Sequence, residues 1–185
     1  LAKNAVKGTK LANKADDLAD AAKGVDRLDD ISDVTKGIKV GDTLEDGSKV
    51  VRISSAEEAN RELTRGKYVK PPYDSNKPVY IVKTGGKEKF VRVYGGKSGQ
   101  KGQWIMKHDD VKGLTPKQIQ EKYALPAEPT KICDVNVPKG TELRTGTAAP
   151  VEGWGKGGGQ QYDLQGQRLP NDAWVNERNI GGIVE

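Results

Sequence analysis

The C-terminal third of the chain holds the feature that most limits its fold, a glycine run that no regular element can absorb. Gly155-Lys-Gly-Gly-Gly159 leads into Gln160-Gln-Tyr162, and Gly146-Thr-Ala-Ala-Pro150 precedes it. Because glycine has no Cβ, such a segment can approach other backbone closely or adopt positive φ. We therefore expect a tight connection between strands at residues 155–159, with the Gln161 amide available for hydrogen bonding where loop and strand meet.

The composition indicates many turns and short elements. Among 185 residues there are 23 Gly and 9 Pro, and the hydrophobic fraction of 34% allows only a modest core. The single Cys133 excludes an internal disulfide framework and a cysteine-based zinc site. No apolar run is long enough to span a membrane, and the chain reads as a piece of a longer polypeptide.

The pattern of short elements predicts an α+β fold, a compact antiparallel β-sheet core of short strands with two short helices. Helix-start signals lie at Ser55 and at Thr115-Pro116, with Gln118 placed to complete a capping box before Pro126 ends the helix. A hairpin is expected around Thr84-Gly85-Gly86. The predicted strands are a hairpin within Val40–Val51, then Val79–Lys83, Lys89–Tyr94, Trp104–Met106, Lys131–Val137, Glu142–Thr145 and Gln160–Leu164.

Residues 1–36 differ in amino-acid composition from the rest of the chain. They are rich in Ala, Lys and Asp, and Leu11, Ala15 and Leu18 recur at helical spacing. We expect a helical neck or linker over 1–36, although an ordinary helix packed on the domain fits the pattern equally well. The predicted functional domain covers residues 37–185.

Few side chains offer chemistry on their own. Phe90, Arg92 and Tyr94 share one strand face, which would present the guanidinium to a phosphate or would simply stack it on its neighbours. Trp104 and Trp154 can stack on an aromatic ligand or fill the core. His108 is the only histidine, so two-histidine ribonuclease chemistry is excluded and a surface turn is the plainer interpretation.

Two other chemistries find little support in the sequence. Cys133 lies in a predicted strand with no histidine near it, which indicates a buried, unreactive thiol. The glycine run lacks the Lys-Ser/Thr ending of a nucleotide P-loop. The excess of basic over acidic residues lies in residues 41–100, which contain twelve basic and eight acidic side chains. That density suits one anionic ligand better than a nucleic acid.

Two motifs together resemble a known family. Arg92-Val-Tyr-Gly-Gly followed by Gly102-Gln-Trp104, and Gly146-Thr-Ala-Ala-Pro150 followed by Gly157-Gly-Gly-Gln-Gln-Tyr162, are similar to signatures of the tuberculosis necrotizing toxin family. These are NAD⁺ glycohydrolases found at the C-termini of secreted bacterial toxins. The resemblance covers roughly residues 88–185. The histidine that the family carries between the two motifs has no counterpart here.

The resemblance implies roles for individual residues. Arg92 would lie near the phosphates, Trp104 beside the nicotinamide, and Gln161 at the reacting ribose or water. Arg92 and Gln161 would be the catalytic pair. The implied substrate-binding residues are Arg92, Tyr94, Trp104, Gly159, Gln160 and Gln161.

The resemblance also implies a biological setting. The chain would be a toxin domain of a contact-dependent or Rhs-type polymorphic toxin, secreted or surface-delivered and acting in the target-cell cytoplasm. It would hydrolyse NAD⁺ to nicotinamide and ADP-ribose, with NAD⁺ as substrate and neither metal nor cofactor. A cognate immunity protein is the expected partner, whereas nucleic acid binding and a membrane span are not expected, and the domain would be a monomer outside that complex.

Three alternatives stay open. An ADP-ribosyltransferase uses the same dinucleotide and would need a glutamate, for which Glu142 and Glu152 are candidates. A metal-independent nuclease toxin would draw on the basic middle segment and His108. A binding or structural module would use the glycines only as turns.

Overall fold

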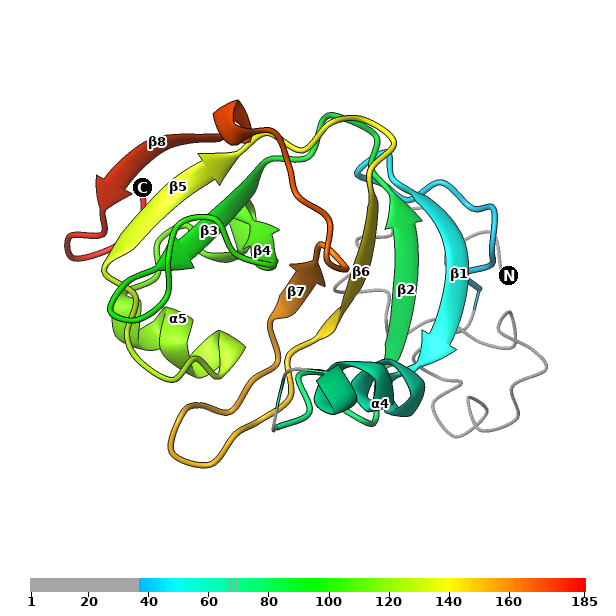
Figure 1. Ribbon diagram of the computed structural model, residues 1–185, viewed down its shortest axis with the longest axis horizontal. Coiled ribbons are helices and arrows are strands. Elements are labelled where there is room, and N and C mark those ends of the chain that lie inside the picture. Colours follow the sequence, from blue (N-terminus) through cyan, green and yellow to red (C-terminus); the bar gives the residue numbers. More distant parts are fainter. Residues whose placement is uncertain (1–36, 67, 69) are drawn as a thin grey trace.

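An eight-stranded antiparallel sheet carries the fold of the residues that the computed structural model describes, 37–66, 68 and 70–185 (Figure 1). The strands follow the order β1-β2-β6-β7-β4-β3-β5-β8 across the sheet. Together with two short helices, this arrangement confirms the predicted α+β class. The expected neck lies outside the described residues, so the boundary at residue 37 stays a prediction. The elements are β1 (Lys49–Ser55), α4 (Ala56–Gly66), β2 (Pro78–Lys83), β3 (Phe90–Tyr94), β4 (Trp104–Lys107), η3 (His108–Asp110), α5 (Pro116–Tyr123), β5 (Lys131–Val135), β6 (Glu142–Thr147), β7 (Gln160–Asp163), η4 (Asn171–Ala173) and β8 (Trp174–Asn179).

One hydrophobic cluster forces the sheet to curve. It takes at least one buried side chain from every strand, so the two ends of the sheet must bend toward the same interior (Figure 1). Burying this apolar surface is the main favourable term for a chain with a modest hydrophobic content. The strand residues of the cluster include Val50, Tyr80, Leu143, Tyr162, Ile105, Phe90, Cys133 and Trp174.

The two α-helices cover other parts of the sheet. Ile119 and Tyr123 of α5 lie in a second cluster with Val91 and Met106, which come from β3 and β4. Helix α4 contributes two small alanines to a third cluster, where Tyr73 and Val79 are also buried. Helix α4 therefore packs near the β1–β2 end of the sheet, whereas α5 packs on β3 and β4, nearer its centre.

Helix α5 begins as the sequence predicts. The Thr115 hydroxyl accepts from the backbone N–H of Gln118 at 3.2 Å, and the Gln118 amide oxygen accepts from the N–H of Thr115 at 2.9 Å. This reciprocal pair satisfies two backbone donors that a helix start would otherwise leave unpaired. Ser55 likewise accepts from the Glu58 N–H at the start of α4, at 3.1 Å.

The predicted hairpin around Thr84-Gly85-Gly86 is wrong. Strand β2 pairs with β1 and β6, whereas β3 pairs with β4 and β5, so this connection crosses between two parts of the sheet. The Glu88 carboxylate accepts from the N–H groups of Gly85 and Gly86, both at 2.9 Å. Thr84 is held by the carbonyl of Pro138, so the turn signal is satisfied without a hairpin. Strand β8 has no counterpart among the predicted elements.

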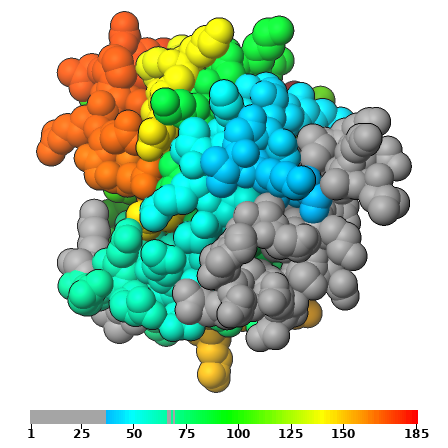
Figure 2. Space-filling model, turned by 90° about the vertical axis from the view of Figure 1, so that its right-hand side faces the viewer, coloured from blue at the N-terminus to red at the C-terminus, as the bar shows by residue number. Residues whose placement is uncertain are grey.

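The glycine run completes the C-terminal end of α5. The N–H of Gly157 donates to the Glu121 carbonyl and that of Gly159 to the Lys122 carbonyl, both at 2.9 Å. These carbonyls belong to the last turn, which has no partners within the helix. The run forms the β6–β7 loop, part of which projects from the body of the molecule (gold in Figure 2). The run does lie between two neighbouring strands, as expected, but within a loop of residues 148–159 and not in a tight turn, and it also caps a helix.

Position 155 requires glycine because the backbone there lies close to the backbone of α5. This close approach leads to a prediction about stability. A Cβ at Gly155 would lie 2.6 Å from the Glu121 carbonyl oxygen, whereas nothing lies within 4 Å of a Cβ at Gly182. Gly155→Ala should lower the free energy of unfolding by about 1–3 kcal/mol, because backbone must shift to admit the methyl group. Urea denaturation measures the change, with Gly182→Ala as the matched control. Equal stability of the two variants would contradict the close approach.

A half-buried ion pair joins the first turn to the sheet. Asp46 accepts from the ammonium of Lys107, and Asp46 Oδ1 also accepts from the Ser48 N–H at 2.9 Å. Burial acts to raise the pKa of Asp46, but Lys107 and Ser48 outweigh it and hold that pKa below its ordinary value of 3.8. The pair therefore stabilises the fold above that ordinary value and loses its contribution as pH falls through the lowered one.

Removal of the Asp46 charge should show this pH dependence. Asp46→Asn should lower the free energy of unfolding by about 2 kcal/mol at neutral pH, since Lys107 loses its charged partner. The difference from the wild type should shrink as pH falls below about 4. Asp109→Asn, at a carboxylate that is 94% exposed, is the control and should change little. A difference that stays constant from pH 7 to pH 3 would rule out the pair as its source.

Candidate active site

A pocket of about 590 Å³ lies where β4 begins and β7 ends. One side is formed by α4 and the other by the loop after β7, which in Figure 2 (orange) lies above the blue-green helix. A concave site with a mixed polar and aromatic lining is the usual form of a small-molecule site. Its lining residues are Glu62, Leu63, Tyr68, residues 101–104, Arg144, residues 163–169, Asn171 and Trp174.

Strand register places three of these residues in one row. Arg144 of β6 pairs with Asp163 of β7, and Asp163 pairs with Trp104 of β4. Residues that pair directly across antiparallel strands project from the same face of a sheet. The row therefore places a cation, an anion and an aromatic ring side by side at the pocket.

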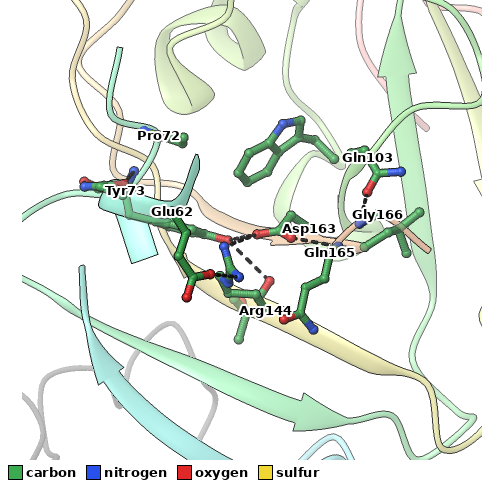
Figure 3. Close-up of polar contacts among 12 residues, drawn as sticks. Glu62, Pro72, Tyr73, Gln103, Arg144, Asp163, Gln165 and Gly166 are labelled. Carbon is green, nitrogen blue, oxygen red and sulfur yellow. Dashed lines mark hydrogen bonds and ion pairs between the residues drawn. The ribbon is translucent and has the colours of Figure 1, made fainter. Parts of the chain in front are cut away.

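Asp163 is the centre of a buried polar network (Figure 3). Its Oδ2 accepts from the Tyr73 hydroxyl at 2.7 Å, and its Oδ1 accepts from the backbone N–H of Gln165 at 2.8 Å. The Arg144 guanidinium lies 3.9 Å from Oδ2 and donates to the Glu62 carboxylate at 2.8 Å. One guanidinium thus holds two carboxylates, one buried and one at the mouth of the pocket.

The two carboxylates differ in their environment. Asp163 is 3% exposed at its side chain, and burial raises its pKa above the ordinary value although Tyr73, Arg144 and the Gln165 N–H oppose this. The Glu62 side chain is 50% exposed and therefore reachable by a ligand. Burial and the neighbouring Asp163 also raise the pKa of Tyr73, so its hydroxyl keeps the proton that it donates.

Aromatic rings form the wall next to this network. The Trp104 ring meets Tyr68 and Tyr73 edge to face, with centroids 5.7 Å apart in each pair. Its indole N–H donates to the Tyr68 hydroxyl at 2.8 Å, which fixes the orientation of the ring. Trp104, predicted as an aromatic position beside a ligand, therefore does line the pocket.

Arg92 lies behind the pocket wall. Its guanidinium donates to the Gly99 carbonyl at 2.9 and 3.2 Å and to the Trp104 carbonyl at 3.0 Å. A Cβ on Gly102 would lie 2.4 Å from the guanidinium carbon, so that glycine makes room for the arginine. Burial lowers the pKa of Arg92. In this arrangement Arg92 holds the backbone that carries Trp104.

Gln161 and Arg92 are not brought together. Register places Gln161 on the same face as Asp163, and Arg92 on the opposite face, with Ile105 and Tyr162. The Gln161 amide donates to the Pro72 carbonyl at 2.9 Å, which helps to hold the chain segment that carries Tyr73. Direct contact of either residue with a ligand stays a prediction.

The remaining substrate-binding candidates contact other parts of the chain. Tyr94 donates through its hydroxyl to Glu177, and the Gln160 amide donates to the Thr145 hydroxyl at 2.6 Å. Gly159 packs against Tyr123, where a Cβ would lie 2.6 Å from the ring. None of the three lines the pocket described above.

His108 and Cys133 lie apart from this pocket. His108 lines a separate pocket of about 400 Å³, and its Nε2 lies 2.7 Å from the Glu185 carbonyl oxygen. Cys133 is buried, and burial raises the pKa of its thiol, as expected of an unreactive cysteine.

Within residues 37–66, 68 and 70–185 no group of His, Cys, Asp and Glu side chains is suited to a metal ion. No helix in that part of the chain has the length and apolar character to cross a membrane.

No motif in the sequence points directly to this network. Glu62, Arg144 and Asp163 are common residue types that lie far apart along the chain. A usable signal was the charge at Arg144 and Asp163 within predicted strands, because a charged residue in a core strand needs a buried partner. Their pairing becomes visible only once β6 lies beside β7.

Comparisons with known proteins do not identify a family for this chain. No protein-family model, curated protein or solved structure gives a significant match to the chain.

The placement of Arg92 leads to a testable expectation. Arg92→Met should lower the free energy of unfolding by about 2–3 kcal/mol, because the carbonyls of Gly99 and Trp104 lose a charged donor. Arg92→Lys should restore only part of this, since an ammonium lacks the planar fork that serves both carbonyls. Urea denaturation is the measurement, and Arg52→Met on an exposed part of β1 is the control. An Arg92→Met protein with wild-type stability and weakened ligand binding would instead support direct contact.

Proposed function

We propose that residues 37–185 form an NAD⁺ glycohydrolase whose reaction takes place in the pocket beside Trp104 and Glu62. The two glycine motifs that resemble the tuberculosis necrotizing toxin family suggest the substrate. The pocket supports the proposal through its volume, its aromatic wall and its paired carboxylates.

The observation that carries the proposal is the Glu62 carboxylate. It is half exposed at the pocket and held by Arg144 at 2.8 Å, while Arg144 is itself anchored beside buried Asp163. A carboxylate held in one orientation can stabilise positive charge on a sugar ring and can take a proton from water. Arg144 limits the rotamers of Glu62 and so prepares it for that role.

The reaction needs no nucleophilic side chain. The bond between the ribose C1′ and the nicotinamide nitrogen breaks, and its electron pair neutralises the pyridinium as nicotinamide leaves. The ribose develops oxocarbenium character, which the carboxylates of Glu62 and Asp163 stabilise through space. Water adds to C1′ and gives its proton to Glu62, which yields ADP-ribose. Trp104 stacks on the nicotinamide ring before it departs.

In this proposal Arg92 and Gln161 position other residues and do not contact the reacting atoms. Arg92 fixes the backbone of Trp104, and Gln161 fixes Pro72, next to the Tyr73 that bonds Asp163. Both would act through the residues that line the pocket. The toxin setting, delivery into a target cell and a cognate immunity protein stay predictions that rest on the resemblance.

Substitution of Glu62 tests the proposal. Glu62→Gln should lower kcat for NAD⁺ hydrolysis about a hundredfold with a small change in KM, because the amide can neither accept the proton nor stabilise the cation. Release of nicotinamide and ADP-ribose is followed by chromatography. Glu57→Gln, at an exposed position on the same helix, is the matched control.

Two outcomes would defeat the proposal. A folded wild-type protein that leaves NAD⁺ intact would exclude the activity. An unchanged kcat in Glu62→Gln would exclude this site. An added protein acceptor and an RNA control distinguish transfer of ADP-ribose and RNA cleavage from hydrolysis.

A further inference from the structure

The pocket is charged unequally at its two ends. At one end Arg144 is neutralised by Glu62 and Asp163, its two acidic neighbours. Two further cations, Lys101 and Arg168, line the pocket. Neither forms an ion pair within the part of the chain that the structure describes.

The segments that carry these cations contain no acid. Residues 98–103 and 164–171 include Lys101 and Arg168 but no Asp or Glu. Both side chains belong to exposed residues, so their charges face solvent at the rim of the pocket. An anionic group entering at this rim would meet two cations and no competing carboxylate.

The rim is held in place by side-chain amides. Gln103 accepts from the Gly166 N–H at 2.7 Å, a contact visible in Figure 3, and donates to the Gln167 carbonyl at 3.3 Å. Gln167 donates in turn to the Leu164 carbonyl at 2.8 Å. The Lys101 ammonium donates to Asn171 at 3.0 Å, which ties one cation to the start of η4. The two segments are thus linked before any ligand arrives.

We propose that Lys101 and Arg168 form a subsite for the phosphate groups of a small nucleotide, with the pyrophosphate at this rim and the glycosidic bond at Glu62. The inference rests on the proposed function for the identity of the ligand. An ammonium and a guanidinium together suit a pyrophosphate, since one acts as a point charge and the other as a bidentate donor. The charge separation within the pocket sets the direction in which the nucleotide lies.

ADP-ribose is the probe because it carries the pyrophosphate and lacks the bond that would be cleaved. Calorimetric titration of ADP-ribose should show affinity reduced roughly ten- to a hundredfold in the Lys101→Ala/Arg168→Ala variant. Wild-type affinity should fall with added salt, and that of the variant should change less. The Lys97→Ala/Arg52→Ala variant removes the same charge from exposed positions outside the pocket and should bind ADP-ribose as the wild type does.

A second readout separates this inference from the proposed function. Nicotinamide riboside has the glycosidic bond but no phosphate, so its hydrolysis should be equal in the wild type and the rim variant, while KM for NAD⁺ rises in the variant alone. If ADP-ribose binding depends on the rim but no hydrolysis occurs, the proposed function fails and the subsite stands.

Three results would overturn the subsite. ADP-ribose that fails to bind the wild type would do so, as would equal affinity of the rim variant and its charge-matched control. Tighter, rim-dependent binding of a single-stranded RNA oligonucleotide would assign these cations to a nucleic acid backbone instead. Thermal denaturation of both double variants establishes that the comparison is between folded proteins.

Discussion

The buried carboxylate of Asp163 constrains this structure more than any other single group. A carboxylate removed from water is costly unless hydrogen bonds and a nearby cation compensate. Here the compensation comes from Tyr73 before β2, from Arg144 on β6 and from the N–H of Gln165, two residues further along the chain than Asp163 itself. Tyr73 and Arg144 can reach Asp163 together only in the folded arrangement. The same interactions that make burial tolerable therefore build one wall of the pocket.

Curvature of the sheet explains why the pocket lies where it does. The hydrophobic cluster that draws on every strand bends the sheet, and β4 and β7 in the middle of the sheet are only four residues long. Where these short strands end, the loops at 99–103 and 164–171 continue beyond the sheet and leave a recess between them and α4. The hydrogen bond from Arg92 to the Trp104 carbonyl and the one that the Gln103 amide accepts from Gly166 then keep those loops in position. The site is thus a consequence of strand length and loop fixation.

Local signals in the sequence predicted the features that local interactions make. Thr115 and Gln118 cap α5 as expected, because every atom of that capping box lies within four residues. The pairing between strands that are distant in sequence could not be predicted from such local signals. The Thr-Gly-Gly signal at 84–86 fits either a hairpin or a crossover, and the choice depends on Pro138, 54 residues away in sequence. The aromatic neighbours of Arg92 suggest a site from sequence alone, whereas the role of Arg144 depends on its pairing with Asp163 across two strands.

The two arginines illustrate how one residue type serves two purposes in this site. Arg92 donates to backbone carbonyls, which carry no net charge, so it rigidifies the wall without an ion pair to any residue that the structure describes. Arg144 donates a hydrogen bond to Glu62 and forms an ion pair with Asp163, so two carboxylates more than balance its charge. Neither guanidinium is then well placed to attract a phosphate. That leaves Lys101 and Arg168, whose charges are not balanced by neighbouring acids in the described chain, as the groups that determine where an anionic ligand enters.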